Sequence, residues 1–576
     1  MRKKGTVHWL IQTVNGKQKR EMVYLLIIQI LTGILGAFNA LFLRDIINAA
    51  VSSQKKIFWK TVIYYALLVA FQLVLAALRR YLEEYTRSSL ENCFKKKLFH
   101  EILIKPYAFV TETHSGEWMN RLTNDTVVVA NGMTEILPGM SGMAVKIISA
   151  IIMISILTPA FMYVLIPGAV LLLIFSTLFR KNMKKLHKNI QECDGNLRVF
   201  LQEMLSSMLI IRSYAVETET ENSAEEKMKL HQKARMKRNF FSNICNMGFG
   251  ILMNGAYVLS AVICGYGIIN HTVSYGTFVA VFQLVSQVQS PFANISGYIP
   301  KFYAMLASAE RLMEIEKAEG QESFEIKSLK KITECYKKDF KGLELENICF
   351  SYVPLKNENK TGIENVPVVL SDISFKIDKK EYIAVTGISG CGKSTILKLL
   401  MCLYSQDKGQ RYILLNRGKE ILDISWQRLF AYVPQGNYLM SGTIREVITF
   451  SDKNRMGDEG KIWEALRIAC ADKFVETIGL EAQLGERGSG LSEGQMQRIA
   501  IARAIFSERP VLILDECTSA LDEDTERQAL YNLRNVTDKT VLIVTHRPAA
   551  LEICDKLLVF TEDGLRVRKG RIHDTE

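Results

Sequence analysis

Long apolar stretches occur in this chain only before about residue 300. Six of them approach the roughly 20 residues that a helix needs to cross a bilayer, and they lie at residues 22–43, 61–78, 136–157, 161–179, 241–269 and 277–300. The polar segments after the second and fourth stretches contain few Pro or Gly, so we expect them to be helical too. The pattern predicts a membrane protein with a six-helix all-α transmembrane domain over residues 1–310.

From about residue 343 the pattern changes to short apolar β runs that alternate with helical segments. This alternation is typical of an α/β domain, which we place at residues 341–576. The segment 311–340 between the two parts is rich in charged residues and is predicted to be a linker. A chain of 576 residues is too long for a single hydrophobic core, which also favours two domains.

The net charge of +12 raises the question of a nucleic-acid partner. Most of the excess Lys and Arg, however, precedes the first apolar stretch or lies in the two long polar segments. Basic residues mark the cytoplasmic side of membrane helices. The distribution therefore predicts a multi-pass protein of the cell membrane, with both ends in the cytoplasm and no nucleic acid as partner. Eleven cysteines without a C-x-x-C pair argue against a disulfide framework and a zinc site.

A glycine-rich motif joins a strand to a helix in the second domain. Residues 382–386 read as a buried strand, and they lead through G-x-x-x-x-G-K-S into a helical segment. Glycines let the backbone wrap a polyphosphate, the helix N-terminus directs N–H groups at it, and the lysine neutralises its charge. The sequence thus predicts a P-loop that binds ATP through Gly387, Ser389, Gly390, Cys391, Gly392, Lys393, Ser394 and Thr395.

A second apolar run, residues 511–514, ends in two acids, Asp515 and Glu516. Acids at the carboxyl end of a buried strand beside a phosphate loop suit metal and water handling. We therefore expect Asp515 and the Ser394 hydroxyl to hold Mg²⁺, and Glu516 to polarise the attacking water. This second pattern is informative only together with the P-loop, because many buried strands end in an acid.

Further motifs make the second domain resemble the ATP-binding-cassette (ABC) family. Leu491-Ser-Glu-Gly-Gln495 resembles the family signature, Tyr432-Val-Pro-Gln435 the Q-loop, Ser519-Ala-Leu-Asp522 the D-loop, His546 the switch histidine, and Tyr352 the aromatic residue that stacks on adenine. One position departs from the pattern, because Glu493 replaces the first glycine of the signature. We expect this side chain to turn to solvent, where an added carboxylate costs little.

The resemblance implies roles for these residues. Gln435 is expected to assist catalysis and to contact Mg²⁺, and His546 to contact the γ-phosphate as a catalytic residue. Ser492, Gly494 and Gln495 would contact ATP that is bound to the other subunit of a dimer. The sequences at residues 114–125 and 203–217 resemble the two intracellular loops of ABC exporters, which carry short coupling helices.

The resemblance implies an exporter-type half-transporter that pairs with a second copy of itself or with a related half. Its expected activity is ATP hydrolysis, with Mg²⁺, coupled to export of a small or amphipathic substrate (a drug, lipid or peptide) by alternating access. An importer with the same fold, a nucleotide-gated channel and a regulatory ATPase stay open as alternatives. Membrane lipid is a further expected partner.

A polar stripe on the sixth apolar stretch bears on the substrate path. Gln283, Gln287, Ser290 and Asn294 share one face of the expected helix. Polar residues at membrane depth seldom face lipid. The stripe either lines the translocation path or joins helices through hydrogen bonds, and the sequence leaves both readings open.

Overall fold

The computed structural model describes residues 2–317, 325–352, 367–388, 390–436, 439–485, 488–536, 538–561 and 564–569. Its internal contacts divide the chain into two compact units. The first, here called the helical unit, comprises Met1–Glu101 and Gly116–Lys317. The second, the sheet unit, comprises Ile102–Ser115 and Ala318–Glu576 and so includes a short piece of the N-terminal half.

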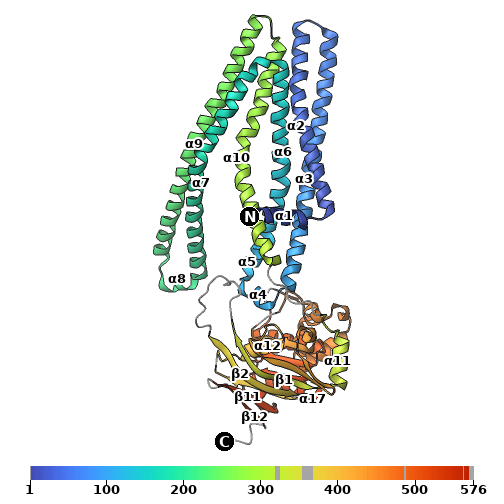
Figure 1. The fold of residues 1–576 in the computed structure, drawn as a ribbon. Coiled ribbons are helices and arrows are strands. Elements are labelled where there is room, and N and C mark those ends of the chain that lie inside the picture. The colour runs from blue at the N-terminus through green and yellow to red at the C-terminus, as the bar shows by residue number, and fades with distance from the viewer. Residues whose placement is uncertain are drawn as a thin grey trace. The chain divides into compact units, whose positions relative to one another are not determined.

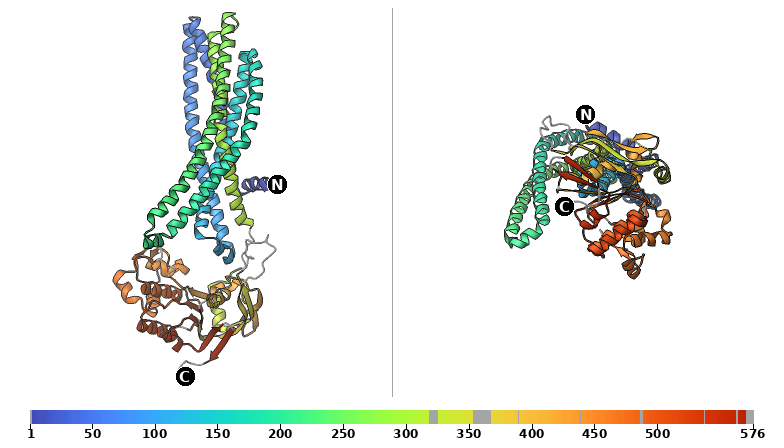
Figure 2. Two further views of the ribbon diagram at one scale, coloured as in Figure 1. Left: turned by 90° about the vertical axis from the view of Figure 1, so that its left-hand side faces the viewer. Right: turned by 90° about the horizontal axis from the view of Figure 1, so that it is seen from below.

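Six long helices form the body of the helical unit, and they run alongside one another (Figures 1 and 2). They are α2 (Gly16–Val51), α3 (Lys55–Ile104), α6 (Thr126–Leu157), α7 (Met162–Ser206), α9 (Glu217–Ile269) and α10 (Tyr275–Lys317). Each predicted apolar stretch falls on one of them, and the polar segments continue α3, α7 and α9 as predicted. In the described part of the chain, α2, α3, α9 and the run Ser115–Leu157 are long and apolar enough to cross a membrane.

Short helices precede or link these long ones. They are α1 (Arg2–Thr13), α5 (Ser115–Asn120), the π-helical turn η1 (Arg121–Asp125), η2 (Pro159–Phe161) and α8 (Met208–Tyr214). α8 ends where Ala215 takes a left-handed conformation with φ of +52°, which is a common way to stop a helix. The two loops that resemble exporter intracellular loops therefore contain short helices.

Small residues let the helices of this unit approach closely. Ala37, Ala40 and Ala150 belong to one buried cluster, and a Cβ added at Gly33 would come within 3.0 Å of Val145. A polar contact joins two helices as well, because Gln287 Nε2 donates to the backbone oxygen of Gly36 at 2.5 Å. Such small-residue packing and interhelical hydrogen bonding is what holds helices together in lipid.

The sheet unit is built on a six-stranded sheet in the order β12-β11-β3-β10-β9-β6. The strands are β12 (Gly564–Lys569), β11 (Lys556–Thr561), β3 (Tyr382–Gly387), β10 (Thr540–Val544), β9 (Val511–Asp515) and β6 (Phe430–Val433). All neighbours are parallel except β12. β9 and β10 are buried along their whole length, as expected for parallel strands that are covered on both faces.

A second sheet, of four strands, has the order β2-β1-β4-β5. It comprises β2 (Val368–Asp378), β1 (Phe340–Ser351), β4 (Lys408–Leu415) and β5 (Gly418–Ile421), and a small ribbon pairs β7 (Gly442–Thr443) with β8 (Gln483–Leu484). Alternate residues of β3, β9 and β10 contribute to two separate cores. The central sheet therefore divides the unit into two layers.

The helices of the sheet unit include two that come from outside the predicted α/β domain. α4 (Tyr107–Glu112) lies just before residues 114–125, which resemble the first intracellular loop, and α11 (Leu329–Lys338) lies within the segment expected to be a linker. The others are α12 (Lys393–Leu400), η4 (Ile424–Leu429), α13 (Ile444–Ile448), η5 (Thr449–Ser451), η6 (Lys453–Arg455), α14 (Glu459–Ile468), α15 (Asp472–Ile478), α16 (Glu493–Phe506), α17 (Glu523–Val536) and α18 (Pro548–Glu552).

Candidate functional site

The predicted P-loop connects β3 to α12, as the sequence indicated. Two of its glycines have left-handed backbones, with φ of +86° at Gly390 and +92° at Gly392, which other residues adopt only at a cost. A Cβ at Gly392 would also come within 2.6 Å of the Leu370 side chain. Both the backbone and the packing therefore require glycine here. Ser389 lies outside the described residues.

Lys393 begins α12 and folds back over the loop. Its side chain is largely buried, and its ammonium donates to the backbone oxygens of Gly387 at 2.7 Å and Ile388 at 3.0 Å. A cation held by the rim of a glycine loop is placed to exchange these carbonyls for phosphate oxygens. Thr395 in the same first turn lies 3.0 Å, oxygen to oxygen, from the hydroxyl of Tyr352.

Asp515 ends β9 and is 2% exposed. Its carboxylate accepts hydrogen bonds from Tyr432 Oη at 3.0 Å and, at 3.5 Å, from Ser394 Oγ. No salt bridge reaches it within the described residues. Burial is the main cause that raises the pKa of Asp515, and the hydroxyl of Tyr432 opposes the shift. A buried carboxylate with no salt bridge in the described residues, beside a hydroxyl, is a donor set that suits Mg²⁺.

Glu516 follows at once and is held in an unusual conformation. Its φ is +48°, a region that costs a non-glycine residue roughly 1–3 kcal/mol. The backbone N–H of Glu516 donates to the carbonyl of Val544 on β10 at 3.1 Å, and its carboxylate accepts from Gln435 Nε2 at 2.6 Å. The two predicted catalytic residues Glu516 and Gln435 are thus in contact.

The parallel sheet explains why these groups meet. Carboxyl ends of parallel strands lie at one edge of a sheet, and β3, β10, β9 and β6 are neighbours in that order. Their ends lead to the P-loop, to His546, to Asp515–Glu516 and to Gln435 respectively. His546 has an exposed side chain at this edge. Sequence positions separated by more than 150 residues are brought together by strand order alone.

The signature motif forms the start of α16. Ser492 is its N-cap: the side chain accepts from the N–H of Gln495 at 3.3 Å, while Gln495 Oε1 accepts from the N–H of Ser492 at 2.9 Å. Glu493 is exposed in the first turn, as predicted. Among hydrogen bonds of the described residues, none joins Ser492, Gly494 or Gln495 to the P-loop.

A network ties the D-loop between two of these motifs. Gln497 on α16 donates to Ser519 Oγ at 3.1 Å and accepts from the N–H of Ala520 at 3.0 Å. From the other side, Arg547 donates to the backbone oxygens of Ser519 at 2.5 Å and Leu521 at 2.6 Å. The D-loop is thereby connected to the signature helix and to the residue that follows His546.

Tyr352 belongs to an aromatic cluster that also contacts the short helix α4. Its ring lies at right angles to Tyr404, with centroids 5.4 Å apart, and it remains 42% exposed. Tyr404 in turn packs edge-on against Tyr107 of α4 at 5.7 Å, and its hydroxyl lies 3.2 Å from Thr111 Oγ1. One tyrosine therefore links the predicted adenine-stacking residue to α4 within the sheet unit.

Sequence reasoning missed Tyr404, and it did not assign a role to Tyr432 or Arg547. Tyr432 alternates with buried residues along β6 and so lies on the face that meets Asp515. That periodicity was the available signal. Tyr404 follows α12 in a loop, where no pattern indicates a partner.

Both parts of the chain match models of one protein family. Residues 22–292 match the family model "ABC transporter transmembrane region", and residues 370–519 match the family model "ABC transporter". The chain belongs to the ABC transporter family. The two models occur in one chain, as in a half-transporter, so the expected fold class of a helical membrane domain followed by a P-loop ATPase domain is confirmed.

Similar proteins include an ATP-dependent lipid A-core flippase of Pasteurella multocida, 27% identical over 94% of this chain and 92% of the relative. The leukotoxin translocation ATP-binding protein LktB of Mannheimia haemolytica is 26% identical over 88% of this chain and 69% of its own length. A solved structure of a bacterial Atm1-family ABC exporter with ATP bound has the same fold, with a TM-score of 0.77 and 18% identity over 96% of both chains.

This ABC transporter is an exporter-type protein that binds ATP and couples its hydrolysis to transport across the cell membrane. It is a multi-pass protein whose ATPase domain is cytoplasmic. These assignments confirm the predicted family, activity and location.

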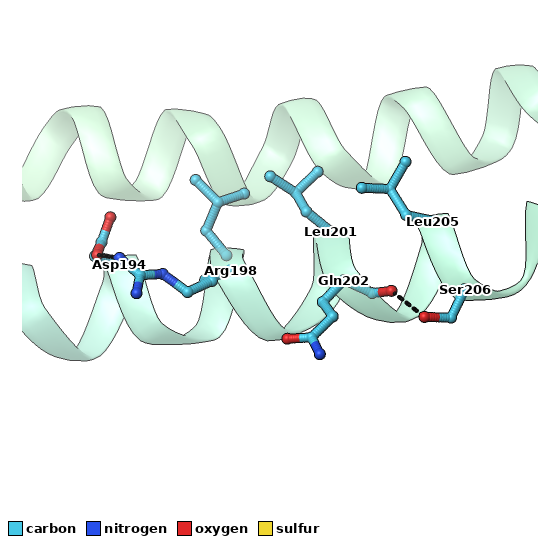
Figure 3. Close-up of a pocket in the computed structure, with 7 residues that line it drawn as sticks. Asp194, Arg198, Leu201, Gln202, Leu205 and Ser206 are labelled. Atoms are coloured by element: carbon cyan, nitrogen blue, oxygen red, sulfur yellow. Dashed lines mark hydrogen bonds and ion pairs between the residues drawn. The ribbon is translucent and has the colours of Figure 1, made fainter. Parts of the chain in front are cut away.

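A groove of about 560 Å³ runs along α7 in the helical unit (Figure 3). It is lined by Asp194, Leu197, Arg198, Leu201, Gln202, Leu205 and Ser206. Its charged residues pair with each other, because Arg198 Nη2 lies 3.4 Å from Asp194 Oδ2. The groove contains none of the predicted site residues, and all of its lining comes from one helix.

Proposed function

We propose that this transporter works as a homodimer that exports a lipid-like amphiphile, with Glu516 as the residue that orients the attacking water. The observation that carries the catalytic assignment is the 2.6 Å hydrogen bond between Gln435 Nε2 and the Glu516 carboxylate at the carboxyl edge of the sheet. A carboxylate held there, next to the P-loop, has the chemistry to accept a proton from water.

The other motif residues take complementary roles. Lys393 and the P-loop N–H groups hold the β- and γ-phosphates, Tyr352 stacks on adenine, and His546 contacts the γ-phosphate. The geometry supports this division, because Lys393 already donates to loop oxygens and Tyr352 presents an exposed ring beside α12.

Mg²⁺ fits this site as the second cofactor. In the described residues, no group of three or more His, Cys, Asp or Glu side chains is placed to hold a metal on its own. Mg²⁺ usually takes one or two carboxylates together with substrate phosphates and water. We propose that Asp515, Ser394 and Gln435 supply the protein oxygens, and that the ion, when bound, neutralises charge on the phosphates.

A second copy of the chain completes the site. Ser492 and Gly494 stand at the start of a 14-residue helix, whose first N–H groups attract anions. Their hydrogen bonds are local, so they are available for ATP held by the P-loop of another subunit. A related half-transporter could complete the site in the same way. This chain, however, contains every motif residue that hydrolysis needs, which favours two working sites in a homodimer. These residues are Lys393, Gln435, Ser492, Glu516 and His546.

The proposed substrate class combines relatives and structure. Relatives include lipid A-core flippases. In the helical unit a cavity of about 190 Å³ lies between α2, α3, α6 and α10, lined by Leu25, Gln29, Arg79, Glu83, Thr134, Glu135, Pro138, Gly139 and Tyr298. This cavity is lined by both charged and apolar groups, a mixture that suits the polar end of an amphiphile and the start of its apolar chain.

The polar stripe contributes less to this proposal than the cavity does. Gln287 is used to join α10 to α2, which favours the hydrogen-bonding reading for that residue. Ser290 is exposed, and the side chain of Asn294 lies outside the described residues. The choice of a lipid-like substrate therefore rests on the cavity and on the relatives.

The test uses the purified chain reconstituted in vesicles with a nitrobenzoxadiazole-labelled phospholipid. We expect ATP hydrolysis and ATP-dependent movement of the probe away from the ATPase side. Glu516→Gln should reduce turnover by about 100-fold or more, because it removes the general base. Glu476→Gln, an exposed position on α15, is the matched control.

Each alternative has its own outcome. Movement of the probe toward the ATPase side would identify an importer. Flux that persists in Glu516→Gln while ATP stays bound would identify a nucleotide-gated channel. Turnover equal to that of wild type in Glu516→Gln would refute the role of Glu516, and no turnover in the wild-type chain alone would refute the homodimer.

A further inference from the structure

The segment that the sequence presents as a linker contains a helix that packs into the core of the ATPase domain. α11 begins after the N-cap Ser328 and buries Ile332 and Tyr336. Both side chains belong to the same core cluster as Trp426 and Phe430. A segment that only bridged two domains would not bury two side chains four residues apart.

One end of this segment is tied to the start of β10. The Tyr336 hydroxyl lies 2.9 Å from Thr540 Oγ1 and donates to the carbonyl of Asp538 at 3.2 Å. Thr540 Oγ1 also accepts from the N–H of Lys380 at 2.9 Å, so the hydroxyl groups of both Tyr336 and Thr540 have hydrogen-bond partners. Burial raises the pKa of Tyr336, which keeps its hydroxyl a donor.

The other end is tied to the segment that leads into β6. The N–H of Lys327 donates to the carbonyl of Ser425 at 3.0 Å. The Lys327 ammonium lies 3.3 Å from the centroid of the Trp426 ring, within the range of a strong cation–π contact. Both Ser425 and Trp426 are in η4, which runs directly into β6. We call residues 327–338 the linker strap.

The two strands that the linker strap holds both act on Glu516. β10 spans about 13 Å from Thr540 to Val544, and the Val544 carbonyl accepts the N–H of Glu516. β6 leads to Gln435, which donates to the Glu516 carboxylate. Because Glu516 has a costly positive φ, its placement depends on these two neighbours.

We propose that Tyr336 and Lys327 are positioning residues, which fix the amino ends of β10 and β6 and thereby hold Glu516 in its hydrolytic conformation. The proposal rests on the proposed role of Glu516. The linker strap also contacts the turn before β3, because Lys379 Nζ donates to the carbonyl of Lys337 at 3.0 Å. Among the described residues, however, it makes no hydrogen bond to β3 itself, the strand that leads to the P-loop. We therefore expect the larger effect on the hydrolytic step and a smaller one on ATP binding.

The test measures ATPase kinetics and amide hydrogen exchange in the full chain. Tyr336→Phe keeps the buried ring and removes the hydroxyl. If the energy of about one hydrogen bond no longer favours the hydrolytic conformation of Glu516, kcat should fall about fivefold, and the KM for ATP should change less than kcat does. Hydrogen exchange at the backbone amide of Glu516 should become faster. Lys327→Gln should act in the same way, and Lys327→Arg should restore kcat because it keeps a cation over Trp426.

Tyr412→Phe, on β4 in the four-stranded sheet, is the matched control and should change neither quantity. The proposal is overturned if Tyr336→Phe behaves like this control. It is also overturned if exchange rises only in residues 329–340, or uniformly across the sheet unit with a matching loss of thermal stability, because either result means a merely structural role. Exchange at Glu516 needs no turnover, so this readout stands even if the role of Glu516 in catalysis fails.

Discussion

A buried aspartate in the helical unit and one in the sheet unit have opposite electrostatic surroundings. Asp125 is fully buried at the end of η1, where Arg311 Nε donates to Oδ2 at 2.8 Å, Arg311 Nη2 donates to Oδ1, and Ser308 Oγ donates to Oδ1 at 2.8 Å. Asp515 is buried almost as deeply, but its partners in the described residues are two hydroxyls.

The difference separates a structural carboxylate from a functional one. A buried charge is stable when it is paired and hydrogen-bonded, and Asp125 meets both conditions by joining η1 to α10. Asp515 has no salt-bridge partner among the described residues, and burial raises its pKa, so a metal ion would supply the counter-charge that Arg311 supplies to Asp125. A carboxylate that is buried without a counter-charge therefore marks the site, whereas burial by itself does not.

Asp125→Asn should have the largest effect on folding stability. It keeps the shape of the side chain but removes the negative partner of Arg311, whose side chain is 44% exposed. Because water can solvate the Arg311 charge that is left, we expect the loss of the charged hydrogen bonds to cost about 1.5–3 kcal/mol. Thermal unfolding of the detergent-solubilised protein measures the loss.

The control is Asp194→Asn, which breaks the exposed pair with Arg198 on α7, where the Asp194 side chain is 48% exposed. Exposed pairs contribute about 0–1 kcal/mol, so this variant should unfold close to wild type. Equal losses in the two variants would show that Asp125 is no more important than a surface residue.

Asp515→Asn should have a smaller effect and the opposite sign. Burial raises the pKa of Asp515 from its usual value of 3.8, so the folded chain binds this proton more tightly than the unfolded chain does. Its contribution to stability is then fully present below pH 3.8 and is lost as the pH rises through the folded pKa. The variant should therefore unfold at a higher temperature than wild type at pH 7.5, without nucleotide or Mg²⁺, and the gap should narrow toward pH 4.5.

Asp522→Asn gives the matched comparison, because hydrogen bonds from Thr525 lower the pKa of Asp522. This group contributes stability above its usual pKa, so its loss should destabilise the protein at pH 7.5. If Asp515→Asn also destabilised the nucleotide-free protein at that pH, Asp515 would be a paired structural residue like Asp125.

Much of the fold could be predicted because periodicity reports burial. The apolar stretches correspond to the long helices, and the runs at 382–386 and 511–514 correspond to β3 and β9. The helix α11 was not predicted because the segment is rich in lysine and reads as polar. Its buried residues are only one pair, Ile332 and Tyr336, at positions i and i+4. Ser328 as N-cap was the signal that could have shown it.

The parts of the candidate site that are formed by consecutive residues could be predicted from the sequence. The P-loop and the acidic pair are local motifs, so their residues could be named before the structure. The contacts between Gln435 and Glu516, and between Tyr404 and α4, depend on strand order and on chain segments about 80 to 300 residues apart. No local pattern encodes such distances.

Glu493→Gly, which restores the usual signature glycine, should have the smallest effect. Glu493 is exposed in the first turn of α16, where a negative charge gains about 0.3–1 kcal/mol from the helix dipole. The variant should lose less than about 1 kcal/mol of stability, and the KM for ATP should change less than about twofold because water screens an exposed charge. Glu493→Gln separates charge from backbone, since it removes the carboxylate and keeps the side-chain length. A KM that falls about tenfold in both variants would place Glu493 against bound ATP and would make it a third kind of carboxylate, exposed in one chain yet functional in the dimer.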